Sequence, residues 1–213
     1  MRKRKYTALP LASATHAHAA PRDDIPAPTI HNIVSTAQIE ACHMPLDLDV
    51  MGEVIPGASY DKKRFAAMTI RMHRPTCTIL LFRSGKMVVT GGKCWYESVC
   101  ACLSLKAILR KRLVGTDFHM RKCTIENIVA HVEVPIPPGH HLDLNAMYAE
   151  LNIHCTYSKK MFPGLIFRPE ACPVVCLCFH SGKIVVTGGK STADVYRGWE
   201  SLWPVVRTFV RAK

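Results

Sequence analysis

The sequence predicts an α+β fold in which two copies of one unit share a single antiparallel sheet. The first observation is a twelve-residue block, Phe82–Lys93, which returns 97 residues later as Phe179–Lys190 with two positions changed. The second is that each block reads as a strand, a Ser-Gly-Lys turn and another strand, since glycine accepts the positive φ of tight turns. The third is a long helical pattern after each block. Two copies of such a unit favour a pseudo-symmetric domain over a solenoid.

The two blocks predict hairpins with one uncharged face. Thr78–Phe82 and Val174–Phe179 are β-branched and aromatic runs of strand length. Side chains alternate between faces along a strand, so one face of each hairpin carries only uncharged residues. These are Thr78, Leu80, Phe82, Val88 and Thr90 in the first hairpin and Val175, Leu177, Phe179, Val185 and Thr187 in the second. The rims carry Lys86, Lys93, Lys183 and Lys190. An apolar floor with a basic rim fits the minor groove of DNA.

The other elements follow in the same order in both halves. We expect strands over 29–36 and 127–131, short helices over 46–55 and 142–151, strands over 64–73 and 162–168, and long helices over 94–113 and 191–211. Apolar residues recur at helical spacing in both long helices, which predicts that they pack on the sheet. Pro204 is expected to kink the second long helix or bend its start.

An asparagine recurs at the same place in the two copies. Asn32 and Asn127 stand two residues before Val34 and Val129, so each pair shares a strand face. Asparagine is depleted from strand interiors, and its side chain both donates and accepts hydrogen bonds. Two interpretations remain open here: a contact residue, or an asparagine satisfied by the neighbouring backbone.

The amino-acid composition indicates the chemical class of the binding partner and excludes several classes of site. The chain has 28 Lys and Arg against 16 Asp and Glu, a formal net charge of +12. This charge favours a polyanionic partner through counterion release, although basic structural proteins share this feature.

The sequence contains no metal-site, catalytic or membrane-spanning pattern. Its 10 cysteines include no Cys-x-x-Cys pair, so we expect buried thiols and no metal or cofactor. No nucleotide, hydrolase or metalloprotease motif is present, which predicts that the protein is not an enzyme. No apolar run is long enough to cross a membrane.

The chain divides into a tail and two repeats. Residues 1–28, basic at the start and then rich in Ala and Pro, are expected to be disordered. Their cluster Met1–Lys5 fits a nuclear import signal, an extra phosphate contact or a solvated terminus. The first repeat with its linker, 114–122, spans residues 29–122, and the second spans 123–213.

Five segments together resemble the TATA-box-binding protein family. They are Asn32–Thr36, Lys63–Ala67, Phe82–Gly91, Phe162–Ile166 and Phe179–Lys183, in family order from about residue 29 to the C-terminus. The resemblance implies a saddle: a curved ten-stranded antiparallel sheet whose concave face straddles DNA, with four helices on the convex face. It also implies a nuclear general transcription factor that binds promoters and nucleates assembly of a pre-initiation complex.

The resemblance assigns roles to individual residues. The phenylalanines that wedge between base steps map to Phe65, Phe82, Phe162 and Phe179. Base-edge contacts map to Asn32, Asn127, Thr90, Thr187, Val34, Val129, Val88, Val185, Leu80 and Leu177. Phosphate contacts map to Arg64, Arg71, Ser84, Lys86, Lys93, Arg168, Ser181, Lys183 and Lys190.

One surface departs from the family pattern. The loop before Phe162, where the family carries acidic residues that meet transcription factor B, reads Lys159, Lys160 and Met161. We therefore expect partners of the factor B, factor A and other promoter-complex classes to meet an altered surface. An alternative is a TATA-independent interaction hub. Whether the free protein forms a homodimer through the concave face stays open at this point, although exposed apolar surfaces favour such contacts. A repair glycosylase with a saddle subdomain would need a further helical domain, for which the chain has no room.

Overall fold

The computed structural model describes residues 25–170 and 172–212. Most of the predicted tail, including Met1–Lys5, lies outside the described residues. The first repeat contains β1 (Thr29–Ala41), α1 (Leu48–Val54), β2 (Ala58–Ser59), β3 (Ala67–His73), β4 (Thr76–Phe82), β5 (Lys86–Gly92), α2 (Trp95–Arg112) and β6 (Phe118–Met120). The second contains β7 (Thr124–Glu133), β8 (His140–Leu142), α3 (Leu144–Leu151), the 3-10 turn η1 (Asn152–His154), β9 (Cys155–Thr156), β10 (Leu165–Phe167), β11 (Val175–Cys178), β12 (Lys183–Gly189), α4 (Thr192–Val206), η2 (Arg207–Phe209) and β13 (Val210–Ala212).

One continuous sheet joins the two repeats. Ten strands follow one another in the order β2-β3-β4-β5-β1-β7-β12-β11-β10-β9, and β6 joins this sheet by pairing with β1. At its centre β1 and β7 are antiparallel, with Ile33 opposite Ile128. Outward from this pair, each half repeats the same order of strands. The predicted α+β fold, with two repeats in one antiparallel sheet, is confirmed.

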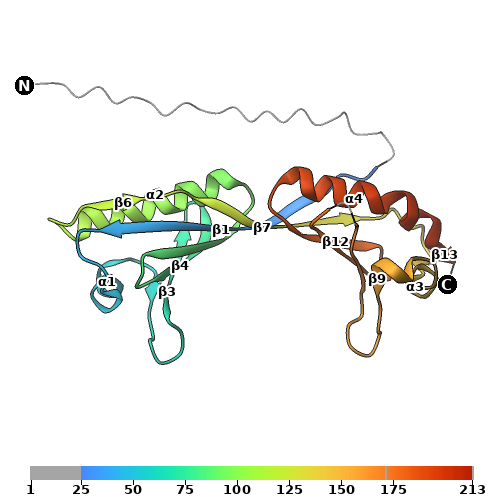
Figure 1. Ribbon diagram of the computed structural model, residues 1–213, viewed down its shortest axis with the longest axis horizontal. Helices are drawn as coiled ribbons and strands as arrows, with labels where there is room; N and C mark the ends of the chain where they lie inside the picture. Colours follow the sequence, from blue (N-terminus) through green and yellow to red (C-terminus); the bar gives the residue numbers. More distant parts are fainter. Residues whose placement is uncertain (1–24, 171, 213) are drawn as a thin grey trace, which may run out of the picture.

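The sheet is arched (Figure 1). Helices α2 and α4 run along its convex side, and α1 and α3 lie towards the two outer ends. The loops between β2 and β3 and between β9 and β10 hang below the ends of the arch. No helix in the described part of the chain is long and apolar enough to span a membrane.

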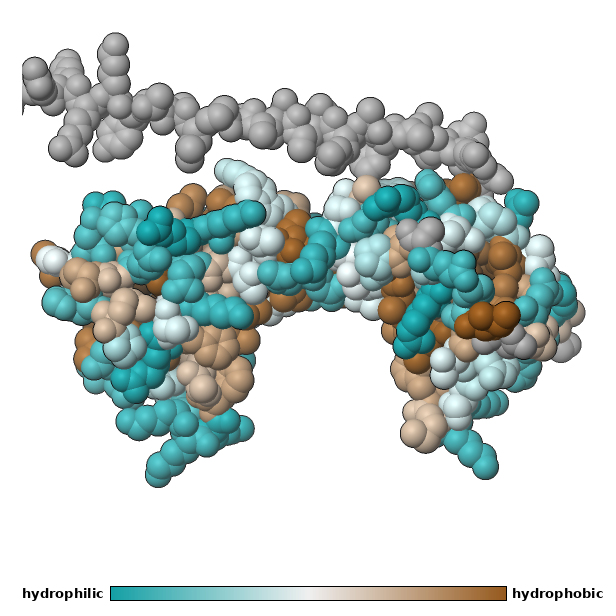
Figure 2. Space-filling model, in the orientation of Figure 1, coloured by the Kyte–Doolittle hydropathy of each residue, from teal (hydrophilic) through white to brown (hydrophobic). Residues whose placement is uncertain are grey.

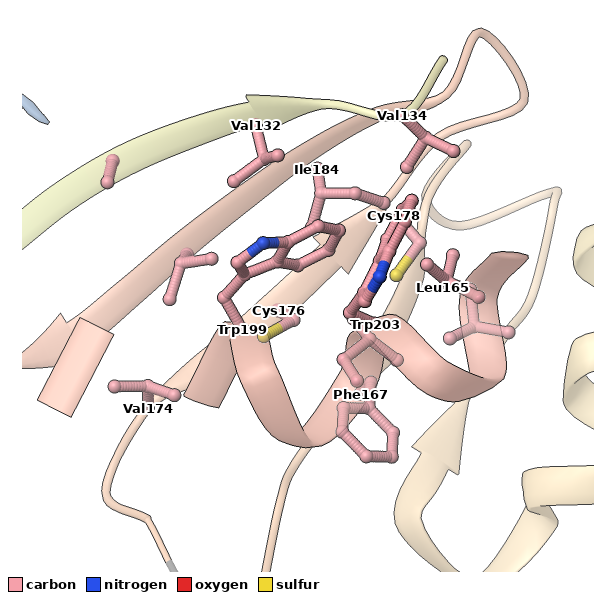
Figure 3. Close-up of a cluster of buried hydrophobic side chains, with 14 of the residues drawn as sticks. Val132, Val134, Leu165, Phe167, Val174, Cys176, Cys178, Ile184, Trp199 and Trp203 are labelled. Atoms are coloured by element: carbon pink, nitrogen blue, oxygen red, sulfur yellow. The ribbon is translucent and has the colours of Figure 1, made fainter. Parts of the chain in front are cut away.

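Each half buries its own core between the sheet and the helices. Alternate strand residues face this core, as Ile79 and Leu81 do in β4 and Ile184 and Val186 do in β12. In the second half the rings of Trp199 and Trp203 lie 5.4 Å apart and pack against apolar side chains of the strands (Figure 3). Tryptophan buries a large apolar area, so α4 is fixed firmly to the sheet.

The start of the first repeat is held by the second. The indole nitrogen of Trp199 donates a hydrogen bond to the carbonyl of Pro26 at 2.7 Å, and Ile25 packs against the same core. Because β1 follows directly, its N-terminal end is fixed from both repeats.

Two differences from the predicted elements bear on the site. Strands β3 and β10 begin at Ala67 and Leu165, three residues later than predicted. Phe65 and Phe162, predicted to lie in these strands, therefore lie in the preceding loops. The cause is a local turn in each loop: the amides of Arg64 and Phe65 donate to Asp61 O, and those of Met161 and Phe162 donate to Ser158 O.

Other predicted boundaries were too short or too long. Strand β1 continues to Ala41 rather than residue 36, because apolar and polar residues go on alternating through Ile39. Helix α4 ends at Val206 rather than residue 211, two residues after Pro204, and β13 pairs with β8. The interval 114–122, predicted as a linker, contains β6, which pairs with the last residues of β1.

The packing of α4 predicts opposite effects for two helical glycine substitutions. A Cβ at Gly198 would overlap Val174 Cγ2, whereas a Cβ at Gly52 in α1 would lie 3.8 Å from Met68 Sδ, an ordinary contact. We expect Gly198→Ala to destabilise the protein by about 1–3 kcal/mol through overpacking. Gly52→Ala should be neutral or stabilise by up to about 1 kcal/mol. Urea unfolding followed by circular dichroism measures both, and equal effects would contradict the packing of Gly198 on Val174.

Candidate nucleic-acid interface

The underside of the arch is hollow, and its floor is largely apolar. Figure 2 shows open space between the two lobes, with hydrophobic side chains along their inner edges and hydrophilic tips below. The side chains on the strand face opposite the core are half-buried: Val34, Leu80, Val88 and Thr90 in the first repeat, and Val129, Leu177, Val185 and Thr187 in the second. The structure thus has the alternation that the sequence predicts.

Four phenylalanines form two matched pairs, one in each half. The rings of Phe65 and Phe82 lie 6.3 Å apart at 64°, and those of Phe162 and Phe179 lie 5.8 Å apart at 66°. Both are edge-to-face arrangements, which aromatic pairs favour. One ring of each pair comes from a hanging loop, and the other is the last residue of β4 (Phe82) or the residue directly after β11 (Phe179). The two pairs therefore lie in opposite halves of the arch, one on each side of the hollow. None of the four rings is in the buried core, and Phe65 is 49% exposed.

A glycine fits between the rings of the second pair. A Cβ at Gly164 would lie 2.8 Å from Phe162 Cε1 and 3.0 Å from Phe179 Cε1. Real side chains do not approach so closely, so any larger residue would displace the rings. The loop sequence Phe162-Pro163-Gly164 therefore positions the pair as well as supplying one member.

The recurring asparagines are fixed by equivalent hydrogen bonds. Asn32 Oδ1 accepts from the Gly91 amide at 2.7 Å and from Thr90 Oγ1 at 3.2 Å. Asn127 Oδ1 accepts from the Gly188 amide at 2.8 Å, and its side chain is also hydrogen-bonded to Thr187 Oγ1. The side-chain oxygen of each asparagine is therefore hydrogen-bonded to the neighbouring backbone, as the second of the two interpretations predicts. Because an amide proton fixes the oxygen, Nδ2 is the donor end of each side chain.

Exposed cations and hydroxyls surround this floor. All nine predicted phosphate contacts are exposed: Arg64, Arg71, Ser84, Lys86, Lys93, Arg168, Ser181, Lys183 and Lys190. Eight of them have no acidic side chain within ion-pair distance among the described residues. The exception is Lys190, whose Nζ lies 2.8 Å from Glu126 Oε2.

Sequence reasoning missed one group of residues on this face. Glu126 accepts a hydrogen bond from Thr36 Oγ1 at 2.8 Å, and its contacts with Lys190 and Thr36 lower its pKa. The rings of His31 and His131 lie 4.0 Å apart. Desolvation, then His131, Lys93 and Lys183, lower the pKa of His31. Glu126 and His31 each directly precede a recurring asparagine, and that shared position is the signal that could have identified them.

Comparison with known proteins decides the family. The family model described as "Transcription factor TFIID (or TATA-binding protein, TBP)" matches residues 27–112 and 122–209. The chain belongs to the TATA-binding protein family. This is a family of transcription factors rather than enzymes.

Individual relatives agree with this assignment. The chain is 36% identical over 182 residues to "TATA-box-binding protein 2" of Arabidopsis thaliana, covering 85% of this chain and 86% of that one. It is 37% identical to "TATA-box-binding protein" of Schizosaccharomyces pombe, covering 85% and 75%. The solved structure "Methanococcus jannaschii TBP" superposes with a TM-score of 0.71 at 29% identity, covering 86% of this chain and 99% of that one.

The loop that departs from the family pattern is a separate exposed surface. Lys159 and Lys160 are exposed and Met161 is 86% exposed. They occupy the hanging loop between β9 and β10, directly before Phe162. The corresponding loop of the first repeat carries Lys62 and Lys63, also exposed.

Proposed function

We propose that this protein binds the minor groove of promoter DNA in the nucleus, kinks the duplex with its two phenylalanine pairs, and nucleates assembly of a transcription complex. The observation that carries the proposal is the placement of the phenylalanines: two edge-to-face pairs outside the core, one in each half of the arch, beside the hollow between the lobes (Figure 2). Apolar wedges of this kind enter between base steps and unstack them, a mode for which this family is the standard example.

The floor between the pairs suits A·T base pairs. In the minor groove A·T pairs present only acceptors, whereas guanine adds an amino donor. The Asn32 and Asn127 oxygens are occupied by backbone amides, so their Nδ2 groups would donate to those acceptors. A guanine amino group placed against Val34, Val88 or their counterparts would lose its hydrogen bonds, at a cost of about 1–3 kcal/mol.

Sequence preference also follows from bending. Pyrimidine–purine steps such as TA unstack more easily than others. A protein that gains contact area only after kinking two steps therefore favours sites with TA steps at those positions, without reading their base edges.

Partner proteins would meet the face that does not touch DNA. We propose proteins of the factor B and factor A classes and further promoter-complex subunits as partners, with acidic patches opposite Lys159 and Lys160. Self-association through the concave face would compete with DNA, because both use the same apolar floor.

A second candidate function is a hub that reaches promoters through other subunits. The lysines before Phe162 favour it, since they reverse the charge of a partner surface. The retained phenylalanine pairs favour direct DNA binding. Bending distinguishes the two functions.

Removing one phenylalanine pair should abolish bending. We expect the wild-type protein to bend a TATA-containing duplex, measured by fluorescence transfer between its ends, and Phe162→Ala/Phe179→Ala to leave the duplex straight. Tyr148→Ala, which removes an exposed aromatic ring of α3, is the matched control and should bend normally. If the wild-type protein neither binds nor bends the duplex at moderate salt, the hub function is correct instead.

The cation set predicts the salt dependence. Each phosphate contact contributes about −0.9 to the slope of log affinity against log salt, so engagement of all the Lys and Arg residues in the set should give a slope of about −6. Lys86→Ala/Lys183→Ala should make it shallower by about 2, whereas Lys111→Ala on α2 should leave it unchanged. A wild-type slope near −2 would show that most of these residues do not contact phosphate.

We expect charge reversal in the loop before Phe162, but not in the equivalent loop of the first repeat, to weaken binding of a partner protein. Lys159→Glu/Lys160→Glu should weaken binding of the host's own factor B-like protein by about tenfold, the expected effect of two rim charges. Lys62→Glu/Lys63→Glu, in the equivalent loop of the first repeat, should have no effect. Titration calorimetry measures both, and unchanged affinity of the first variant would exclude this loop from the interface.

A further inference from the structure

The two repeats differ at one pair of equivalent positions on the concave face. His31 in β1 and Glu126 in β7 each directly precede the recurring asparagine. Their partners are equivalent as well: Glu126 accepts a hydrogen bond from Thr36 of β1, and the ring of His31 contacts that of His131 of β7 at an interplanar angle of 57°. One side of the pseudo-two-fold axis therefore carries a carboxylate and a hydroxyl, and the other carries two imidazoles.

A bulge turns both residues towards the hollow. The β1–β7 register shifts between Val34 and Ser35, which leaves Glu126 unpaired, and again between Ile30 and Asn32, which leaves His31 unpaired. In a regular strand, the residue next to an asparagine on the concave face would point into the core. A bulge adds one residue and re-aims its side chain. Glu126 consequently reaches Thr36, which shares its strand face with Val34 on the apolar floor.

Each position is surrounded by one lysine from each repeat. Glu126 lies against Lys190 and within the field of Lys86, and His31 lies within the field of Lys93 and Lys183. The two surroundings are equivalent, so the difference between the sides arises from Glu126 and the two histidines. The Glu126 side carries one negative charge more than its counterpart.

On this basis, and resting on the proposed minor-groove binding, we propose that Glu126 and the His31–His131 pair make the concave face read the two halves of its DNA site differently. Glu126 accepts a hydrogen bond from the amino group of a guanine, so one half of the site contains a G·C pair. The histidine pair faces A·T pairs in the other half. The protein then binds its site in one orientation.

The chemistry of the minor groove supports this assignment. An ionised carboxylate only accepts hydrogen bonds, and the guanine amino group is the one base-edge donor in the minor groove. Opposite an A·T pair, Glu126 would face acceptors only. A neutral imidazole carries one N–H donor, and A·T pairs present only acceptors in the minor groove, so the histidine pair suits A·T pairs. The ion pair between Glu126 and Lys190 is compatible with DNA binding. Lys190 can turn to contact a phosphate, while the Glu126 carboxylate retains its hydrogen bond from Thr36 and accepts a second one from the guanine amino group.

Selection of bound duplexes from a randomised pool tests the proposal. Wild-type protein should enrich an asymmetric motif, with G·C at one off-centre position preferred over A·T by about tenfold, the effect of one charge-assisted hydrogen bond. Glu126→Ala should convert that position to A·T. Glu126→Gln, which retains an acceptor oxygen, should keep part of the preference. His31→Gln, at the equivalent position, should leave the G·C position unchanged and alter the A·T preference only in the other half.

Orientation and folding are measured alongside. A fluorophore at the C-terminus and an acceptor on either end of the selected duplex should report one orientation for the wild type and a mixture for Glu126→Ala, and circular dichroism should show that each variant is folded. A symmetric A·T motif for the wild type, or an unchanged G·C position in Glu126→Ala, overturns this inference while leaving minor-groove binding intact. Absence of any binding or bending by the wild type overturns both.

Discussion

The whole arrangement depends on the antiparallel pairing of β1 with β7. This pairing is the only sheet connection between the repeats among the described residues, and it places Ile33 opposite Ile128 on the core side. Because strand side chains alternate between faces, a slip of one residue would move these isoleucines to the hollow and bring Asn32 and Val34 into the core. The register thus determines at once which residues are buried and which form the floor. It also sets the separation of the phenylalanine pairs, since each pair is connected to the centre by the same series of strands.

The concave face must remain uncovered in the free protein if it is to bind a DNA groove, and two features of the structure allow this. Each half has enough core of its own, with Trp199 and Leu202 in one and Leu105 and Leu109 in the other, so folding does not need the concave face to be covered. The Asn32 and Asn127 oxygens are satisfied internally by backbone amides. Their donors and the threonine hydroxyls are thereby pre-oriented, which reduces the entropy that binding must overcome.

Much of the fold could be predicted because it rests on local patterns written twice. The repeated Ser-Gly-Lys turn and the alternation on either side of it fix both hairpins, and the spacing of Val195, Trp199 and Leu202 fixes the buried face of α4. Elements held by contacts distant in sequence could not be predicted. Strands β6 and β13 are three residues long and exist because β1 and β8 offer them free edges. Phe65 and Phe162 were expected on strands, but their amides bond to Asp61 and Ser158 in turns that the apolar pattern does not reveal.

The same limit explains why the asymmetry of the site was missed. Sequence alternation assigns the residues beside Asn32 and Asn127 to the core, so His31 and Glu126 would both be interpreted as polar side chains misplaced in the core. The register shifts between β1 and β7, together with the contacts of Glu126 with Thr36 and of His31 with His131, show that both belong to the concave face. The duplicated sequence forms two equivalent bulges. The residue at each bulge lies outside both hydrophobic cores, so core packing does not restrict which side chain occupies it. Substitution at these two positions can therefore alter how one half of the groove is read while the sheet, the phenylalanine pairs and the surrounding lysines remain symmetric.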